Sequence, residues 1–329
     1  MKRIALIGEC MIELNGSSFG AMQQTYGGDS LNTAVYLARI AGQSVAIDYI
    51  SALGFDAISD GMIMRWQQEG INTTTVLRDK HRQPGLYLIQ LDEFGERTFL
   101  YWRDQSAARY MLRHSEFERI VKHLDGVDMV YLSGISLAIL PPDDRQQLID
   151  LLTRLSKKGV SIIFDSNYRP ALWEDSETTR HCYHQLFAIT DLALVTNDDE
   201  AALWGDTSEE ETLLRLKQTG VKQAVVKMGP KGNYYENFMM DIRTFVAATV
   251  VKNVVDTTSA GDSFNAGFIA GVIRGLSPVK CSELGHQLAG IVIQHKGAII
   301  PASETAEINC NNDQTTTNIF NQYINKEIV

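Results

Sequence analysis

The strongest chemical signal in the sequence is a run of small and polar residues at 256–264, which reads D-T-T-S-A-G-D-S-F. It stands between an apolar segment and a long stretch of helical period. Small side chains at a helix start leave backbone N–H groups uncovered, and the helix dipole adds positive potential, so an anion is favoured there. Asp262 falls in the first turn of this expected helix. Its carboxylate can either cap the helix or accept a proton from a hydroxyl that attacks a bound phosphate.

The elements that must position this segment follow from hydrophobic periodicity, because apolar runs of strand length alternate with segments of helical period. The expected strands are 4–7, 45–50, 128–132, 160–164, 192–195, 223–227 and 250–255. The expected helices are 31–41, 57–69, 143–158, 260–273 and 279–294. Asp29 or Ser30 can cap the first helix, and Gly42 can end it. Repeated strand–helix units predict an α/β fold with a mostly parallel central sheet and helices on both faces.

Two strand-like segments, 86–91 and 98–102, break this pattern. They flank a turn-rich link at 92–96 and therefore predict a β-hairpin. Hairpin strands do not fit inside a parallel sheet, so we expect a small separate β-sheet that serves as a lid, formed by segments at about 9–26 and 83–105. Residues 1–303 are expected to form one domain, followed by a polar tail at 304–329.

Composition narrows the class of protein. The chain has 329 residues, and its 30 Lys and Arg against 40 Asp and Glu give a net charge of −10, so nucleic-acid binding has no electrostatic basis. The four cysteines lie far apart with no C-x-x-C pair, which predicts neither a disulfide framework nor a thiolate metal site. No segment approaches the roughly 18 uninterrupted apolar residues of a membrane span. We expect a soluble cytoplasmic protein.

Four motifs resemble those of the PfkB-type, ribokinase-like carbohydrate kinases. The segment 256–264, followed by Asn-Ala-Gly, is similar to the carboxy-terminal motif of that family, and G-G-D-S-L-N-T-A at 27–34 to its amino-terminal, sugar-binding motif. D-S-N-Y-R at 165–169 resembles the D-x-N-x-R strand end, and N-D-D-E at 197–200 the N-x-x-E motif. Their order along the chain is that of the family, which implies a ribokinase-like fold. Ser259 departs from the family pattern, where glycine is usual.

A narrower resemblance points to the branch of this family that acts on 2-keto-3-deoxygluconate, a sugar acid. The segments that carry it are 85–87, 97–103, 131–138, 167–170 and 297–301. The resemblance implies phosphorylation of the terminal hydroxyl of that sugar acid, with ATP and Mg²⁺ as cofactors.

The resemblance also implies roles for single residues. It assigns the general base to Asp262 and an anion hole to the N–H groups of Ser259, Ala260 and Gly261. It implies that Asn197 and Glu200 organise Mg²⁺ through water; a helix N-terminus with solvated acids is the alternative. The residues that it places at the nucleotide are Asn167, Arg169, Asn197, Lys227, Gly229, Lys231 and Gly232, together with 259–261. An ordinary exposed turn is the alternative for 227–232.

The substrate-binding candidates lie in the sugar-binding motif and in the hairpin. Glycines permit close backbone approach and polar side chains can hold sugar hydroxyls, which leads to Gly27, Gly28, Asp29 and Asn32. Simple helix capping would explain Asp29 alone but leaves Asn32 unexplained.

A carboxylate substrate of an acidic protein needs local cations, and arginine binds a planar carboxylate bidentately. Arg103 on the lid and Arg169 at a strand end are the candidates. Tyr87 and Tyr101 would pack on the sugar and offer hydroxyls, or else simply pack within the hairpin.

Two other functions remain open from the sequence. One is a fructokinase- or ribokinase-like kinase of a neutral sugar, and the other is a catalytically silent homologue that senses a sugar or nucleotide. A homo-oligomer that pairs through the β-lid is expected from the family resemblance.

Overall fold

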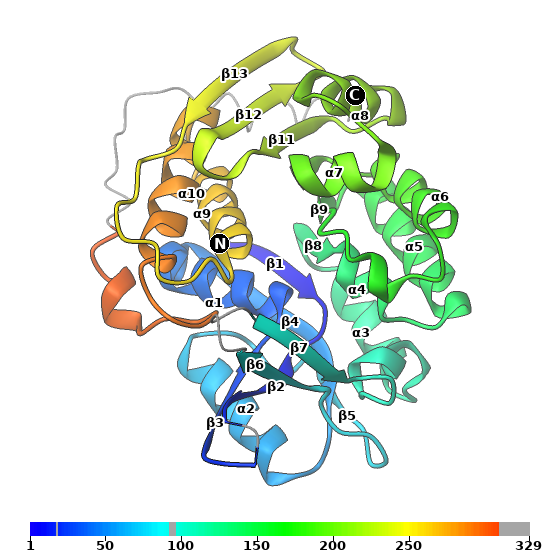
Figure 1. Cartoon of the computed structure of the whole chain (residues 1–329). Helices are drawn as coiled ribbons and strands as arrows, with labels where there is room; N and C mark the ends of the chain where they lie inside the picture. Colours follow the sequence, from blue (N-terminus) through cyan, green and yellow to red (C-terminus); the bar gives the residue numbers. More distant parts are fainter. Residues whose placement is uncertain (18, 92–96, 309–329) are drawn as a thin grey trace.

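The computed structural model describes residues 1–17, 19–91 and 97–308 (Figure 1). Within these ranges the chain forms a nine-stranded sheet and a separate four-stranded sheet. The large sheet contains, in spatial order, β13 (Ile242–Ala247), β12 (Gly232–Asn237), β11 (Gln223–Lys227), β10 (Leu192–Thr196), β9 (Ser161–Asp165), β8 (Met129–Ser133), β1 (Lys2–Ile7), β4 (Val45–Leu53) and β5 (Val76–Arg78). Neighbours from β11 to β5 are parallel, whereas β12 and β13 extend the sheet in antiparallel pairs. The predicted mostly parallel α/β sheet is therefore confirmed.

Helices cover both faces of this sheet, as Figure 1 shows. The described α-helices are α1 (Asp29–Ala41), α2 (Ala57–Gln68), α3 (Phe117–Leu124), α4 (Gly134–Ala138), α5 (Pro142–Lys157), α6 (Ser176–Phe187), α7 (Asn197–Trp204), α8 (Glu209–Thr219), α9 (Ala260–Ile273) and α10 (Pro278–Val292). Side chains of β1 alternate between two hydrophobic cores: Ala5 and Ile7 pack with α5 and α6, whereas Ile4 and Leu6 pack with α1, α9 and α10. A strand buried on both faces explains its continuous apolar sequence.

The smaller sheet is built from the segments predicted to form a lid. Its spatial order is β3 (Met22–Gly27), β2 (Met11–Gly16), β6 (Leu86–Leu91) and β7 (Arg97–Trp102). The predicted hairpin is confirmed, because β6 and β7 pair antiparallel with Tyr87 opposite Tyr101. This sheet joins the body through the segment between β1 and β2 and through α1, which follows β3 directly (Figure 1). The turn expected at 92–96, and the part of the expected tail from 309 to 329, lie outside the described residues.

Local sequence sets the ends of the two helices that matter for the site. The bounds of α9 coincide with the predicted helix. Gly42 follows α1 with a φ of +53°, a left-handed conformation that suits glycine. The prediction that Asp29 or Ser30 caps α1 is wrong: Gly28 occupies the N-cap position and no side chain caps this helix. The side chain of Asp29 is thereby left to make other contacts.

One predicted strand is absent from the described structure. Residues 250–255 form an irregular connection between β13 and α9, in which the side chain of Val250 is 86% exposed. The edge of the sheet at this end is taken by β12 and β13, which the periodicity analysis did not predict. The apolar run therefore faces solvent with no strand beside it. In the same described ranges no helix has the length and apolar character to cross a bilayer.

Candidate active site

The polar residues singled out in the sequence gather where the carboxyl ends of parallel strands meet the first turns of α1 and α9. The two helices are joined there by hydrogen bonds. Asn32 Nδ2 donates to Asp262 Oδ2 at 2.8 Å, and Thr33 Oγ1 donates to the backbone oxygen of Asp262 at 3.3 Å. Ligands of open α/β sheets bind at this edge of the sheet. The sugar-binding motif and the anion segment, 230 residues apart, are thus brought together.

The loop at 256–262, called the anion loop below, presents uncovered backbone donors. No side chain caps α9, and Ser259 at its N-cap has a left-handed backbone with a φ of +64°. The first N–H groups of a helix have no partner within the helix, so those of Gly261 and Asp262 are available to a ligand. The N–H of Ala260, predicted as part of the anion hole, instead donates to Thr257 O at 3.2 Å.

The shape of the anion loop depends on the segment near residue 300. Asp256 Oδ1 accepts from the N–H of Thr258 at 2.9 Å, and its Oδ2 accepts from the N–H of Gly297 at 2.8 Å. The hydroxyl of Tyr36 in α1 donates to Ala298 O at 2.7 Å and accepts from the N–H of Ile300 at 3.2 Å. Residues 297–300 therefore hold both the anion loop and α1.

The carboxyl group of Asp262 has a raised pKa, as a general base that works near neutral pH needs. Burial is the main cause that raises the pKa of its carboxyl to about 7, and the negative charges of Asp29 and Asp165 add to it. The hydrogen bond from Asn32 acts in the opposite direction by favouring the ionised form. A base that titrates near neutral pH is matched to proton transfer at that pH.

Asp29 faces the end of β9 rather than capping its own helix. Its Oδ2 accepts from Asn167 Nδ2 at 2.8 Å, and its Oδ1 accepts from the N–H of Ser30 at 2.8 Å. Burial raises the pKa of Asp29. Asn167, which the resemblance placed at the nucleotide, thus contacts the sugar-binding motif. It does so from a left-handed backbone with a φ of +30°.

The two glycines of the sugar-binding motif are required by neighbouring protein atoms. A Cβ on Gly28 would lie 2.2 Å from the backbone oxygen of Glu9, and one on Gly27 would lie 2.7 Å from the hydroxyl of Tyr87. From the sequence, we expected these glycines to permit close approach of a ligand to the backbone. In the structure they let the lid sheet approach the start of α1, which places lid side chains beside the motif.

A buried polar cluster lies beneath the anion loop. Lys227 Nζ donates to Asn265 Oδ1 at 3.0 Å and lies 3.4 Å from Asp165 Oδ1, and Asn265 Nδ2 donates to Asp165 Oδ2 at 2.8 Å. Lys227 Nζ would be 3.8 Å from a Cβ on Gly261. Lys227 thus compensates the charge of Asp165 below the loop. Asn265 and Asp165 received no role from the sequence, although both stand within the motifs quoted there.

The other nucleotide candidates lie at the turn after β11 and at the end of β9. Lys231 is exposed in a turn, between Gly229 with a φ of +55° and Gly232 with a φ of +124°. A Cβ on Gly232 would lie 2.1 Å from Val246 O, so the pairing of β12 with β13 requires this glycine. Arg169 is half-exposed, and its Nη1 donates to Asp199 Oδ1 at 3.3 Å.

The proposed metal residues lie at the start of α7. Asn197 is partly buried at its first position, and Glu200 is fully buried with its Oε2 accepting from Arg215 Nη2 at 2.7 Å. No group of three or more His, Cys, Asp or Glu side chains in the described ranges could form a metal cage. Mg²⁺ is commonly held by one or two oxygen ligands, several waters and substrate phosphates. These residues fit that mode of binding and not a dedicated all-protein cage.

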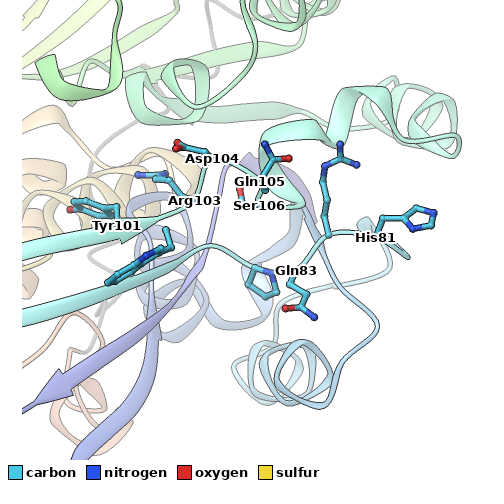
Figure 2. Close-up of a pocket in the computed structure, with 10 residues that line it drawn as sticks. His81, Gln83, Tyr101, Arg103, Asp104, Gln105 and Ser106 are labelled. Carbon is cyan, nitrogen blue, oxygen red and sulfur yellow. The ribbon is translucent and has the colours of Figure 1, made fainter. Parts of the chain in front are cut away.

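Tyr87 and Tyr101, both proposed for substrate binding, lie in the lid sheet, and Arg103 directly follows its strand β7. The rings of Tyr87 and Tyr101 are 6.0 Å apart, and the hydroxyl of Tyr87 donates to the buried carboxylate of Glu13. Arg103, only 9% exposed, donates through Nη2 to Glu9. The segments 81–84 and 101–106 line a cavity of about 680 Å³. Figure 2 shows Tyr101 and Arg103 among the side chains at this cavity. Glu9 and Glu13 were not predicted, because nothing near them in the sequence marks a carboxylate in the interior.

Replacing Ser259 with glycine is expected to stabilise the protein by about 1 kcal/mol. A non-glycine residue in the left-handed region stores strain of roughly 1–2 kcal/mol, which the glycine removes. Part of this gain is lost because glycine has greater freedom in the unfolded chain. Urea unfolding measures the change. Ser208→Gly is a matched control, since Ser208 caps α8 from an extended backbone with a φ of −151°. It should lose a few tenths of a kcal/mol. A Ser259→Gly variant no more stable than the wild type would contradict the expectation.

Comparisons with known proteins agree with this geometry. A model of the pfkB family carbohydrate kinases matches residues 1–306. The 2-dehydro-3-deoxygluconokinase of Haemophilus influenzae is 54% identical over 301 residues, which cover 91% of this chain and 96% of that protein. The enzyme of the same name from Escherichia coli K12 is 44% identical over 303 residues and covers 91% and 97%. The structure of a candidate ribokinase II from Escherichia coli in complex with ATP and Mg²⁺ has a TM-score of 0.77 at 21% identity and covers 91% and 94%.

Proposed function

The chain belongs to the pfkB family of carbohydrate kinases, and on that premise we propose that it transfers the γ-phosphoryl group of ATP to the terminal hydroxyl of 2-keto-3-deoxygluconate (2-dehydro-3-deoxygluconate). The products are ADP and 2-keto-3-deoxy-6-phosphogluconate. The observation that carries this substrate is identity of 54% and 44%, over 91% of the chain, to two kinases of this sugar acid. The fold, which resembles that of an ATP- and Mg²⁺-bound structure, is compatible with it.

In the proposed reaction Asp262 is the general base. The terminal hydroxyl oxygen of the sugar acid bonds to the γ-phosphorus, the bond from that phosphorus to the ADP oxygen breaks, and the hydroxyl proton passes to Asp262. The hydrogen bond from Asn32 orients this carboxylate. The N–H groups of Gly261 and Asp262 would bind the phosphoryl oxygens as charge shifts among them, which is the main contribution a protein makes to phosphoryl transfer.

We further propose that the nucleotide lies between the anion loop and the turn after β11, with Lys231 and Gly229 beside its phosphates. Mg²⁺ would supply positive charge beside the phosphates when bound. Asn197 would hold it through water, and Glu200, which Arg215 fixes in place, would contribute through the same water layer.

The pH dependence of the reaction should report Asp262. Its pKa is about 7, raised by burial and by Asp29 and Asp165, and the base works only when it is ionised. Because the protonated fraction grows as pH falls through about 7, kcat/KM for the sugar acid should drop by about tenfold per pH unit on the acid side. Initial rates between pH 5 and pH 9 at saturating ATP measure this. A flat profile from pH 5 to pH 8 would argue against this base.

We propose that the lid sheet closes over the sugar-binding motif and pairs with the lid of a second copy. The support is exposed apolar surface on β7, where Leu100 is 38% and Trp102 58% exposed. A monomeric mass in sedimentation equilibrium would contradict the pairing.

We place the enzyme in the cytoplasm, where ATP is supplied.

A sugar panel tests the proposed function directly. The sugar acid, fructose and ribose would each be offered with Mg-ATP, and ADP release followed in a coupled assay. We expect kcat/KM to be at least 100-fold higher for the acid, since a neutral sugar lacks the carboxylate that Arg103 would bind with charge-assisted hydrogen bonds of about 1.5–3 kcal/mol each. Faster turnover of fructose or ribose would reject the substrate, and no ADP release with any sugar would reject a kinase of these substrates.

A further inference from the structure

The residue that holds Arg103 in place is a carboxylate to which the sequence gave no role. Glu9 follows β1 after a single glycine, and only 3% of the residue is exposed. A buried carboxylate is costly unless a charged partner compensates it. The partner of Glu9 is Arg103, 94 residues later in the chain, whose Nη2 donates to Glu9 Oε2.

This contact leaves part of the Arg103 guanidinium without a hydrogen bond to the described residues. Arginine and a carboxylate often form a fork of two parallel hydrogen bonds. Here a single bond joins them, and both Glu9 Oε1 and Arg103 Nε are buried with no hydrogen-bond partner among the described residues. A guanidinium carries five N–H donors. Glu9 therefore anchors one corner of the group and leaves other donors for a second carboxylate.

Glu9 also lies between the lid and the sugar-binding motif. Its backbone oxygen is 2.2 Å from the position of a Cβ on Gly28, and its Oε1 is 3.0 Å from that of a Cβ on Gly85. The same Cβ on Gly85 would be 3.1 Å from Cβ of Arg103. Gly28 thus lies against the backbone of Glu9 and Gly85 against both side chains, which places the pair beside the motif that would hold the sugar.

We propose that Glu9 is a positioning residue for substrate recognition: it holds the Arg103 guanidinium in the orientation that binds the carboxylate of the sugar acid. Without Glu9, the guanidinium of Arg103, which lines the cavity in Figure 2, would lose the hydrogen bond that orients it. Fixing the group before binding lowers the entropy lost on binding. This inference rests on the proposed function, because it takes the sugar acid as substrate and Arg103 as its contact.

The test compares Glu9→Met, which keeps the length of the side chain and removes the acceptor, with Glu9→Gln, which keeps an amide oxygen as acceptor. Glu9→Met should raise KM for the sugar acid at least tenfold, with kcat within threefold and KM for ATP within twofold of the wild type. Glu9→Gln should stay within threefold of the wild-type KM. A role in folding alone would not give this split between KM and kcat.

The double variant Glu9→Met/Arg103→Ala shows whether Glu9 acts through Arg103. Its KM for the sugar acid should equal that of Arg103→Ala within threefold. A higher KM in the double variant, or a wild-type KM in Glu9→Met, overturns the inference. If Glu9→Met does not fold, the double variant decides alone, since it removes both buried charges together. Failure of the wild-type protein to phosphorylate the sugar acid is a different result, and refutes the proposed function together with this inference.

Discussion

Replacing Asp262 with asparagine is expected to lower kcat by about 10²- to 10⁴-fold, the usual contribution of a general base. Asparagine has nearly the same shape and can still accept the hydrogen bond from Asn32, so the position of the side chain should be kept while the proton acceptor is lost. KM for the sugar acid and for ATP should change little. Steady-state rates measured with the coupled ADP assay give both constants.

A matched control is Asp143→Asn. Asp143 also lies in the first turn of a helix, α5, but is exposed to solvent. Its kcat should remain within twofold of the wild type. A wild-type kcat in the Asp262→Asn variant would remove Asp262 from the chemistry, whatever its position.

The Asp262→Asn variant should also be at least as stable as the wild type above pH 7. In the folded protein the pKa of this carboxyl is about 7, above its ordinary value of 3.8, so the folded state binds the proton more tightly than the unfolded state. The resulting destabilisation is absent below pH 4, grows as pH rises to about 7, and is complete above it. Thermal unfolding at pH 8 therefore separates lost chemistry from lost folding.

The second large effect is expected from Arg103→Ala, which should raise KM for the sugar acid by about 10- to 100-fold. Each hydrogen bond between charged groups contributes about 1.5–3 kcal/mol, and 1.4 kcal/mol corresponds to a factor of ten. The truncation also leaves Glu9 buried without its partner. The measurement is KM for the sugar acid at saturating ATP.

Arg169→Ala is the matched comparison for Arg103→Ala. Arg169 is half-exposed and pairs with Asp199, so solvent weakens its interactions and its loss should raise KM for the sugar acid less than the loss of Arg103. KM for ATP in the Arg103→Ala variant should stay within twofold of the wild type, which shows that the body of the protein is intact. An unchanged KM for the sugar acid would take Arg103 out of the substrate site.

Hydrophobic periodicity predicted the bounds of some helices and strands correctly and one strand wrongly. The bounds of α9 and β11 agree with the predictions. The prediction of a strand at 250–255 was wrong. An apolar run favours a strand, but a strand needs a neighbour, and β12 and β13 already occupy that edge of the sheet. Which segment takes an edge depends on the whole sheet and not on the local sequence.

The candidate residues were found by motif, whereas their partners could not be predicted. Nothing in the sequence links Arg103 to Glu9 or Asn167 to Asp29, because pairs so far apart along the chain are set by the fold. The arginines illustrate the consequence. Arg103 and Arg169 were both proposed as local cations for a carboxylate, and each has an acidic partner in the structure.

The hydrogen bonds made by residues 297–300 determine when the site can form as the chain is synthesised. A nascent chain folds from its N-terminal side during synthesis, and by the time β13 has emerged every strand of the large sheet is available. Gly297 must still leave the ribosome before Asp256 can gain its second donor, and Ala298 before Tyr36 can gain its acceptor. Catalytic competence therefore requires a segment that is synthesised after every strand of the large sheet.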